Sequence, residues 1–395
     1  MKIIASAVSL LASLSSCNAE ASLLRAAIST DDSPTIIDLS QDIPRDEAAI
    51  SSSPGAKAVQ EAASQDPTIL NVMVLENGSI VASYHRDDVD PSETLPVMSV
   101  TKSWMSLLFG MLVDDGLLSL EDTLGDIFPD DAAWADVTDG STDFRKGATI
   151  EELLTYTSGL LDTLDMTGIP EFGLGGQSLQ GSLSYPLVGV KGEFAYLAQS
   201  QIHSYIFKEL TGMTPGQYLA ENVMSKLGIG EDEYDWDQNE DGVEFGGFGL
   251  FLTPFQMAKF GQLYLQGGRT SPSNDERLIS ERWIDASFTH HSTLSKSTYL
   301  GELDGDERVQ GTPYGYCFAG LHKHSSGSTV YCAVGAGGNY ICVDRYLDRV
   351  MILQREPQFF YEFNILDLVV DNTLSFRAPN GGLSGISSTA ESRTE

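Results

Sequence analysis

The sequence has few basic residues, few cysteines and no long apolar run. Lys and Arg number 23 among 395 residues, against 56 Asp and Glu, and the formal net charge is -33. A chain this acidic repels polyanions, so neither nucleic acid nor an anionic membrane surface is expected as a partner. No stretch approaches the roughly 20 consecutive apolar residues that a transmembrane helix needs. We therefore expect no membrane span, and a well-solvated surface explains the acidity better than a cationic substrate does.

Several chemical motifs are also missing. The chain contains no Gly-x-Ser-x-Gly sequence, which disfavours an α/β-hydrolase. The histidine pairs at 290–291 and 322–324 have no glutamate at the spacing of a zinc protease. The acidic run 235–241 alternates like the start of a calcium loop, but Glu240 and Gly246 stand where such a loop needs Gly and Glu. The sequence therefore indicates neither a metal ion nor an organic cofactor.

The first residues are typical of a secretory signal peptide. Met1-Lys2 leads into an apolar, serine-rich stretch up to Leu14, and Ala19 offers a small residue before a cleavage point. We expect residues 1–19 to be removed and the protein to be secreted. Residues 20–45 mix Ser, Thr, Asp and Pro, residues 377–395 are rich in Gly, Ser and Thr, and both segments are expected to be flexible.

Three cysteines remain if the signal peptide is removed. Cys317 and Cys332 lie in apolar runs on either side of the polar stretch 322–328, which predicts a hairpin. A cross-strand Cys317–Cys332 disulfide and two buried free thiols are the alternatives, because directly opposed strand cysteines often have poor bridging geometry. Cys342 would then be left over.

Strand patterns occur near both ends of the chain and helical patterns between them. Residues 70–75 and 80–84 are two strands joined by Asn77-Gly78, a preferred hairpin turn. Asn77-Gly78-Ser79 is also an acceptor sequence for N-glycosylation, although the turn alone accounts for Asn77. The later strands are expected at 314–319, 329–334, 339–344 and 350–354, followed by a helix at about 359–374.

This order predicts an α/β protein of the α+β type. One antiparallel sheet would be built from both termini and flanked by N- and C-terminal helices. We place the catalytic domain at residues 46–376, with a mainly helical insertion at about 119–310. The stretch 99–118 is apolar nearly all round, which predicts the buried central helix of this domain, and Gly116 marks the end of that helix.

Ser99-Val100-Thr101-Lys102 opens that helix, and its spacing points to nucleophilic catalysis. Residues three apart share a helix face, so the Lys102 amine can reach the Ser99 hydroxyl. The helix N-terminus favours negative charge developing on the carbonyl that Ser99 attacks, and burial would lower the pKa of Lys102. A capping serine with a surface lysine is the alternative. An unpaired charge on an apolar helix is costly, which favours the catalytic interpretation.

From this motif onward the chain resembles the class C β-lactamase-like, penicillin-recognising serine hydrolases. That family includes D,D-peptidases, carboxylesterases and oligomeric-amide hydrolases, and its first motif is Ser-x-x-Lys. The similar segments are Ile150 to Leu160 (IEELLTYTSGL), Gly192 to Tyr196 with the helix after it, Gly246 to Leu265, and Gly335 to Asp344 (GAGGNYICVD). They occur in the family's order over roughly residues 50–375. The resemblance implies a serine β-lactamase/D,D-peptidase-like fold.

The resemblance also implies roles for residues far from Ser99. Tyr196 matches the tyrosine of the family's Tyr-x-Asn motif and would act with Lys102 as acid and base. The asparagine position holds Ala198, so the role of the asparagine amide would be absent or supplied by a neighbour such as Gln199. The backbone amides of Ser99 and Gly338 would form the oxyanion hole.

The third motif departs from the drug-hydrolysing members of the family. Gly335-Ala336-Gly337 stands in place of Lys-Thr-Gly or His-x-Gly, so these substrate-binding positions offer neither a cation nor a hydroxyl. We therefore expect a secreted serine hydrolase acting on a small-molecule ester or amide, without a cofactor. The alternatives are β-lactamase or D,D-peptidase activity, and an inactive binding protein that keeps the fold.

Overall fold

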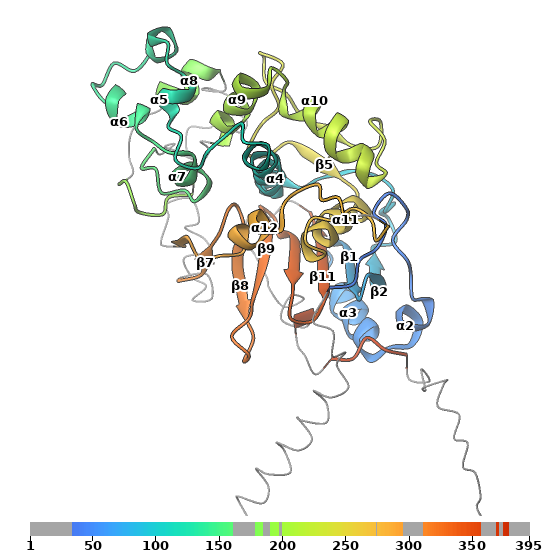
Figure 1. Cartoon of the computed structure of the whole chain (residues 1–395). Helices are drawn as coiled ribbons and strands as arrows, with labels where there is room; N and C mark the ends of the chain where they lie inside the picture. Colours follow the sequence, from blue (N-terminus) through green and yellow to red (C-terminus); the bar gives the residue numbers. More distant parts are fainter. Residues whose placement is uncertain are drawn as a thin grey trace, which may run out of the picture. The chain divides into compact units, whose positions relative to one another are not determined.

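An antiparallel sheet assembled from both ends of the chain organises the protein (Figure 1). The computed structural model describes residues 34–160, 178–184, 190–196, 200–273, 275–294, 311–356, 369–370 and 374–378. The strands of the large sheet are β1 Ile69–Glu76, β2 Ser79–His85, β6 Ser292–Thr293, β7 Pro313–Tyr314, β8 Ala319–Lys323, β9 Thr329–Gly335, β10 Asn339–Asp344 and β11 Arg349–Arg355. Within the described residues they pair in the order β2-β1-β11-β10-β9-β8-β7-β6. N-terminal β1 therefore lies beside C-terminal β11, which confirms a sheet built from both ends.

The β1–β2 hairpin forms as its sequence predicts. Asn77 and Gly78 have φ angles of 49° and 71°, the left-handed values that a tight hairpin turn requires. β1 pairs with β2 on one edge and with β11 on the other, and its residues are buried from Ile69 to Leu75. The tip of the hairpin exposes Asn77, and glycosylation there stays a prediction.

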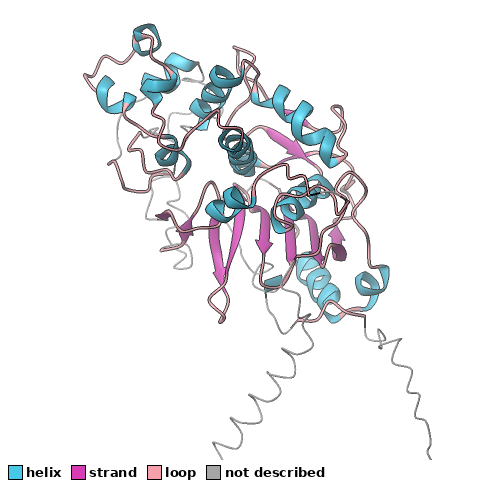
Figure 2. Cartoon of the chain, viewed as in Figure 1, coloured by secondary structure: helices cyan, strands magenta, loops and turns pink. Residues whose placement is uncertain are grey.

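The helices lie mainly between β2 and β6 in the chain. In order, the helical segments are α2 Glu47–Ser52, α3 Pro54–Gln65, η1 Met98–Val100, α4 Thr101–Asp114, α5 Leu124–Ile127, η2 Asp131–Trp134, α6 Thr142–Lys146, α7 Ile150–Leu154, α8 Leu179–Ser184, α9 Ser200–Thr211, α10 Pro215–Leu219, η3 Ala220–Met224, η4 Ser225–Leu227, α11 Pro254–Leu265 and α12 Glu281–Ser287. Those from α5 to α10 gather above the strands of the large sheet in Figure 2. α3 packs on β1 and β2, and α11 packs on β10, β11 and β1. The predicted central helix is α4, which is buried along nearly all its length.

A second, three-stranded sheet lies at the start of α4. It consists of β3 Leu95–Pro96, β5 Leu250–Leu252 and β4 Asp235–Trp236, in the order β3-β5-β4. The segment leading into α4 is thus held by a strand from about 150 residues further along the chain.

The predicted flexible N-terminal segment does not extend to residue 45. Leu39 is fully buried, its N–H donates to the Thr270 carbonyl oxygen at 2.8 Å, and the Pro44 carbonyl oxygen accepts from Ile80 at 2.8 Å. Apolar burial and backbone pairing fix this segment although its composition is polar. Residues 20–33 and the predicted signal peptide lie outside the described residues.

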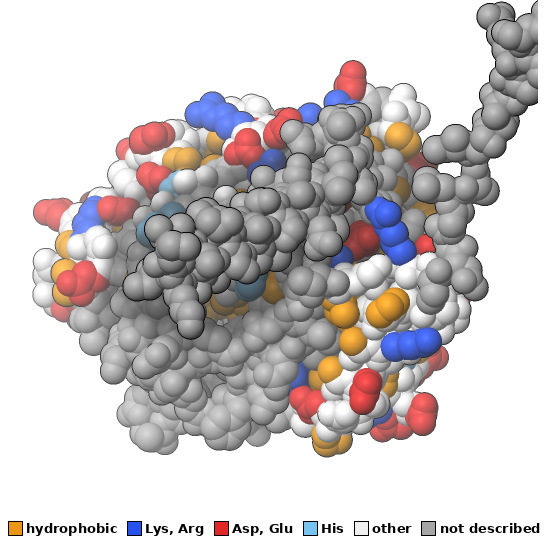
Figure 3. All heavy atoms as spheres, turned by 90° about the horizontal axis from the view of Figure 1, so that it is seen from below, with side chains coloured by type: hydrophobic (Ala, Val, Ile, Leu, Met, Phe, Trp, Pro, Cys, Tyr) orange, Lys and Arg blue, Asp and Glu red, His pale blue; other side chains and the backbone are white. Residues whose placement is uncertain are grey.

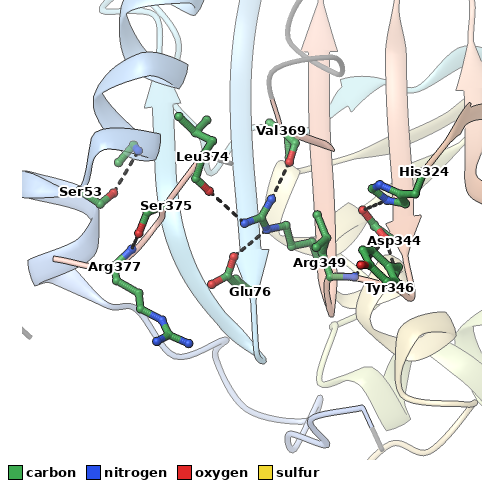
Figure 4. A network of polar contacts seen from close by, with 12 residues as sticks. Ser53, Glu76, His324, Asp344, Tyr346, Arg349, Val369, Leu374, Ser375 and Arg377 are labelled. Carbon is green, nitrogen blue, oxygen red and sulfur yellow. Dashed lines mark hydrogen bonds and ion pairs between the residues drawn. The ribbon is translucent and has the colours of Figure 1, made fainter. Parts of the chain in front are cut away.

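At the other end, Arg349 of β11 holds residues near the C-terminus against the sheet (Figure 4). Its guanidinium is buried and lies 2.6 Å from Glu76 Oε2 on β1. It also donates to the carbonyl oxygens of Val369 (2.8 Å) and Leu374 (3.3 Å). Figure 4 also shows the buried pair of His324 and Asp344, 2.8 Å apart. The predicted final helix and the tail 377–395 lie largely outside the described residues.

Both alternatives for Cys317 and Cys332, a disulfide between them or two free thiols, are wrong. The bond joins Cys332 to Cys342, and Cys317 is a buried free thiol. Cys332 on β9 faces Cys342 on β10. On its other side it faces Ala319 of β8, and Cys317 lies before that strand. The predicted strand 314–319 is interrupted by a turn between β7 and β8, where Cys317 has a φ of 63°.

No helix in the described ranges is both long and apolar enough to cross a membrane. On the face shown in Figure 3, acidic side chains stand next to basic ones over the described part of the surface. The described residues also form exposed ion pairs, such as Arg345 with Asp285 at 2.7 Å. Such pairs contribute little to stability, so the acidic excess acts mainly on solubility and on which charged molecules approach.

Candidate active site

Ser99 sits at the junction between the small sheet and α4. β3 pairs with β5, and the Val97 N–H donates to the Leu250 carbonyl oxygen at 3.0 Å. This is the last contact of the extended segment, two residues before Ser99. Met98 then takes a left-handed backbone with φ 53°, which turns the chain into η1. Ser99 is half-buried and is the second residue of this first helical turn, a position whose backbone N–H has no partner within the helix. Its hydroxyl and its amide are therefore available to a substrate carbonyl group.

The Met98 turn is fixed by side chains of α4. The Thr101 hydroxyl donates to the Met98 carbonyl oxygen at 2.7 Å and accepts from the Leu250 N–H at 3.4 Å. A left-handed backbone at an unbranched non-glycine residue costs free energy and persists only where surrounding contacts impose it. Here those contacts come from α4 and β5 together.

Lys102 reaches Ser99 as the Ser-x-x-Lys spacing predicts. Its Nζ atom lies 2.9 Å from Ser99 Oγ and donates to the Gly247 carbonyl oxygen at 2.8 Å. Only 6% of Lys102 is exposed, and burial lowers its pKa from 10.5 to about 7. Near neutral pH the amine is therefore present in both protonation states, as a proton carrier requires.

Tyr196 lies beside this pair. Lys102 Nζ is 5.0 Å from the centre of the Tyr196 ring, which is half-buried. The structure thus brings together the three residues that the sequence analysis assigned to catalysis, Ser99, Lys102 and Tyr196. Ala198 and Gln199 lie outside the described residues.

The third motif forms the turn between β9 and β10. Gly335, the last residue of β9, lies so close to the segment before Ser99 that a Cβ atom there would clash with the Val97 carbonyl oxygen. The Ala336 carbonyl oxygen accepts from Asn339 Nδ2 at 3.0 Å, and Gly337 has a φ of 82°. The turn therefore lies next to the nucleophile, and close packing explains why its first residue is glycine.

The Gly338 amide, which the sequence analysis assigned to the oxyanion hole, has a partner inside this turn. It donates to the Gly335 carbonyl oxygen at 3.1 Å. For Gly338 to donate to a substrate, this hydrogen bond would have to open. Its role in the oxyanion hole stays a prediction.

Sequence reasoning missed Tyr156 and Ser200. Tyr156 follows α7, is 5% exposed, and its hydroxyl lies 3.1 Å from Ser200 Oγ at the start of α9. Its ring centre is 4.9 Å from that of Tyr196, and both rings contact Tyr314. No spacing rule links these positions. The only sequence signal is that Tyr156 lies within the segment 150–160 that resembles the family.

A family model and a characterised relative match the sequence of the chain. Residues 58–353 match the family model described as Beta-lactamase. The chain is 22% identical over 224 residues to the 6-aminohexanoate-dimer hydrolase of Paenarthrobacter ureafaciens, a match covering 54% of this chain and 55% of that protein. The aligned region thus spans about half the length of this relative.

Solved structures of the same fold are more distant in sequence. A penicillin-binding protein homolog from Caulobacter crescentus is 16% identical, with a TM-score of 0.60, and the match covers 83% of this chain and 98% of that one. A family VIII carboxylesterase is 14% identical, with a TM-score of 0.58, and the match covers 83% and 97%. At these identities the likeness establishes the fold, which agrees with the predicted serine β-lactamase/D,D-peptidase-like architecture.

Proposed function

The chain belongs to the beta-lactamase family, and we propose that it is a serine hydrolase that cleaves a carboxylic ester or a small amide through an acyl-enzyme on Ser99. The contact of 2.9 Å between Lys102 Nζ and Ser99 Oγ carries this proposal. Because burial lowers the pKa of Lys102 to about 7, its neutral form is available to accept the proton of the Ser99 hydroxyl.

The reaction would proceed in two acyl-transfer steps. Ser99 Oγ attacks the carbonyl carbon while its proton passes to Lys102, and the Ser99 amide donates to the oxyanion. Tyr196, whose ring centre lies 5.0 Å from Lys102 Nζ, would pass that proton to the leaving alcohol or amine as the carbon–heteroatom bond breaks. Water then attacks the acyl-enzyme, gives up a proton to the same pair, and releases the acid and free Ser99.

Three features favour esters and simple amides over β-lactams. Gly335 and Ala336 offer no cation or hydroxyl for the carboxylate of an antibiotic. The contact of Gly335 with Val97 leaves no room for a longer side chain at that position. The carboxylesterase and the amide hydrolase among the relatives support the same choice.

Covalent labelling tests the nucleophile. After incubation with a fluorophosphonate probe, the tryptic peptide carrying the adduct should contain Ser99. Ser99→Ala should lower the hydrolysis of a short-chain nitrophenyl ester by about a thousandfold or more, because the nucleophile is lost. Ser106→Ala is the matched control, since Ser106 lies on α4 and its buried hydroxyl has no hydrogen-bond partner in the part of the chain that the structure describes. Retained ester hydrolysis in Ser99→Ala refutes the proposal.

The same experiment separates the alternatives. Nitrocefin turnover comparable with that of the best ester would identify a β-lactamase instead. A folded wild-type protein that takes up no label and hydrolyses neither substrate would be a binding protein that has kept the fold.

Lys102 and Tyr196 are proposed to handle protons as one unit. Groups that act as a unit are non-additive, so Lys102→Ala, Tyr196→Phe and the double variant should lose nearly the same activity. The measurement is ester turnover by the three folded variants. Losses that add in the logarithm of the rate would assign the two residues independent roles.

We also propose that the protein is secreted after removal of residues 1–19. The support is the charged and then apolar pattern at the start of the sequence. N-terminal sequencing of protein recovered from the culture medium of its host should begin near residue 20. Retention of Met1 on the recovered protein would contradict the proposal.

A further inference from the structure

Tyr156 has a backbone conformation that a tyrosine rarely adopts. α7 ends at Leu154, and Tyr156 then has a φ of 56°, in the left-handed region. For a bulky residue this conformation is strained, and such positions persist only where surrounding contacts impose them. The side chain is buried, and burial holds the pKa of its hydroxyl well above 10, so the hydroxyl keeps its proton. Tyr156 is therefore a permanent hydrogen-bonding group in the interior.

One set of contacts leads from Tyr156 to Tyr196. The Tyr156 carbonyl oxygen accepts from the N–H of Ala195, the residue before Tyr196, at 2.8 Å. The next residue, Thr157, accepts from the Gly192 N–H at 2.8 Å. With the two tyrosine ring centres 4.9 Å apart, Tyr156 contacts the Tyr196 segment through both its backbone and its ring.

A second set leads from Tyr156 to the carbonyl group that binds Lys102. The Tyr156 hydroxyl lies 3.1 Å from Ser200 Oγ. Ser200 packs against Gly246 and Gly247 so closely that a Cβ atom at Gly247 would lie 2.8 Å from Ser200 Cβ, and one at Gly246 would clash with the Ser200 carbonyl oxygen. Gly247 in turn accepts from Lys102 Nζ at 2.8 Å.

We propose that Tyr156 is a positioning residue that, with Ser200, holds Lys102 between Tyr196 and the Gly247 carbonyl oxygen. This inference rests on the proposed function, because it concerns the proton carrier of that reaction. Tyr156 does not touch the reacting atoms. It acts through two contacts of Lys102, the Gly247 carbonyl oxygen and the Tyr196 ring.

Removal of single hydroxyl groups tests the proposal. Tyr156→Phe keeps the ring and the backbone but loses the contact with Ser200, and Ser200→Ala removes the same contact from the other side. Each should lower kcat for a nitrophenyl ester about tenfold with little change in KM. Because the Gly247 carbonyl oxygen favours the charged amine, each should also move the acid limb of the kcat/KM profile to lower pH. The double variant should be no slower than the slower single variant.

Tyr205→Phe is the matched control. Tyr205 lies on the same helix, α9, and its hydroxyl donates to Asp241 at 2.7 Å and accepts from Asn239 Nδ2 at 2.9 Å. This variant should keep the wild-type kcat and acid limb even if its melting temperature falls. If Tyr156→Phe does not fold, Ser200→Ala tests the same contact alone.

The outcomes distinguish this inference from the proposed function. The positioning role is overturned if Ser200→Ala and folded Tyr156→Phe keep the wild-type kcat and an unmoved or raised acid limb. In that case, fluorophosphonate labelling of Ser99 leaves the proposed function standing. Independent losses that multiply in the double variant also overturn it. A wild-type protein that takes up no label overturns both.

Discussion

Lys102 should destabilise the folded chain at neutral pH, and replacing it with methionine isolates the size of that effect. Burial lowers the Lys102 pKa from 10.5 to about 7. Between these two values the unfolded chain binds more protons than the folded chain, so the free energy of unfolding rises with pH. The destabilisation is complete below pH 7 and absent above pH 10.5. One pKa unit corresponds to about 1.4 kcal/mol, so the full effect approaches about 5 kcal/mol.

The assay is denaturant unfolding of wild type and Lys102→Met at several pH values. Other titrating groups cancel in the difference between the two proteins. Between about pH 7.5 and about pH 9.5, the free energy of unfolding of wild type should rise by about 2.5 kcal/mol relative to that of Lys102→Met. Lys57→Met, at an exposed lysine of α3, controls for the substitution itself. If the difference in free energy of unfolding between the two proteins stays constant over this range, the lowered pKa of Lys102 is falsified.

Three further predictions concern pH, the disulfide and a buried histidine. The kcat/KM for an ester should fall as pH decreases through about 7, because Lys102 is then protonated, and a flat profile from about pH 5 to 7 contradicts this. Removing the Cys332–Cys342 bond, which spans 10 residues, by a double alanine substitution should lower the free energy of unfolding by about 3 kcal/mol; peptide mapping without reduction that recovers another pairing refutes it. His203 is buried, neither of its ring nitrogens has a hydrogen-bond partner among the described residues, and burial near Lys102 lowers its pKa from 6.5 to about 3. His203→Leu should therefore raise the melting temperature, and more so as pH falls below 6.5, whereas an equal change at pH 5 and pH 8 would argue against the buried imidazole.

The sheet was predictable where local patterns determine it. The Asn77-Gly78 turn and the apolar runs of β9, β10 and β11 can be identified in the sequence, because strand periodicity and hairpin chemistry act over a few residues. The apolar run 314–319 looks equally strand-like, but it turns between β7 and β8. There Gly315 packs against the Ser287 carbonyl oxygen, a contact with α12 that no local pattern reveals. The wrong disulfide partner for Cys332 followed from that one missed turn.

The candidate site divides in the same way. Ser99 and Lys102 are one helical turn apart, so their contact follows from spacing alone. Tyr196 was identified only through the family resemblance. The Gly247 carbonyl oxygen and the Tyr156–Ser200 contact come from three separate segments, and a backbone acceptor has no residue type to mark it. Their part in the site emerges only from tertiary packing.

Backbone strain in the described residues points independently to the same place. Five non-glycine residues there have left-handed φ angles: Asn77, Met98, Tyr156, Cys317 and Asp348. Asn and Asp tolerate this conformation, and Asn77 and Asp348 occupy hairpin turns. Met, Tyr and Cys do not favour it, yet Met98 precedes Ser99, Tyr156 contacts Tyr196, and the Cys317 carbonyl oxygen accepts from Ser103, the neighbour of Lys102, at 2.6 Å. Because none of these three conformations stabilises the fold by itself, their convergence on Ser99 and Lys102 is the pattern expected of a functional site, and it does not depend on the Ser-x-x-Lys motif.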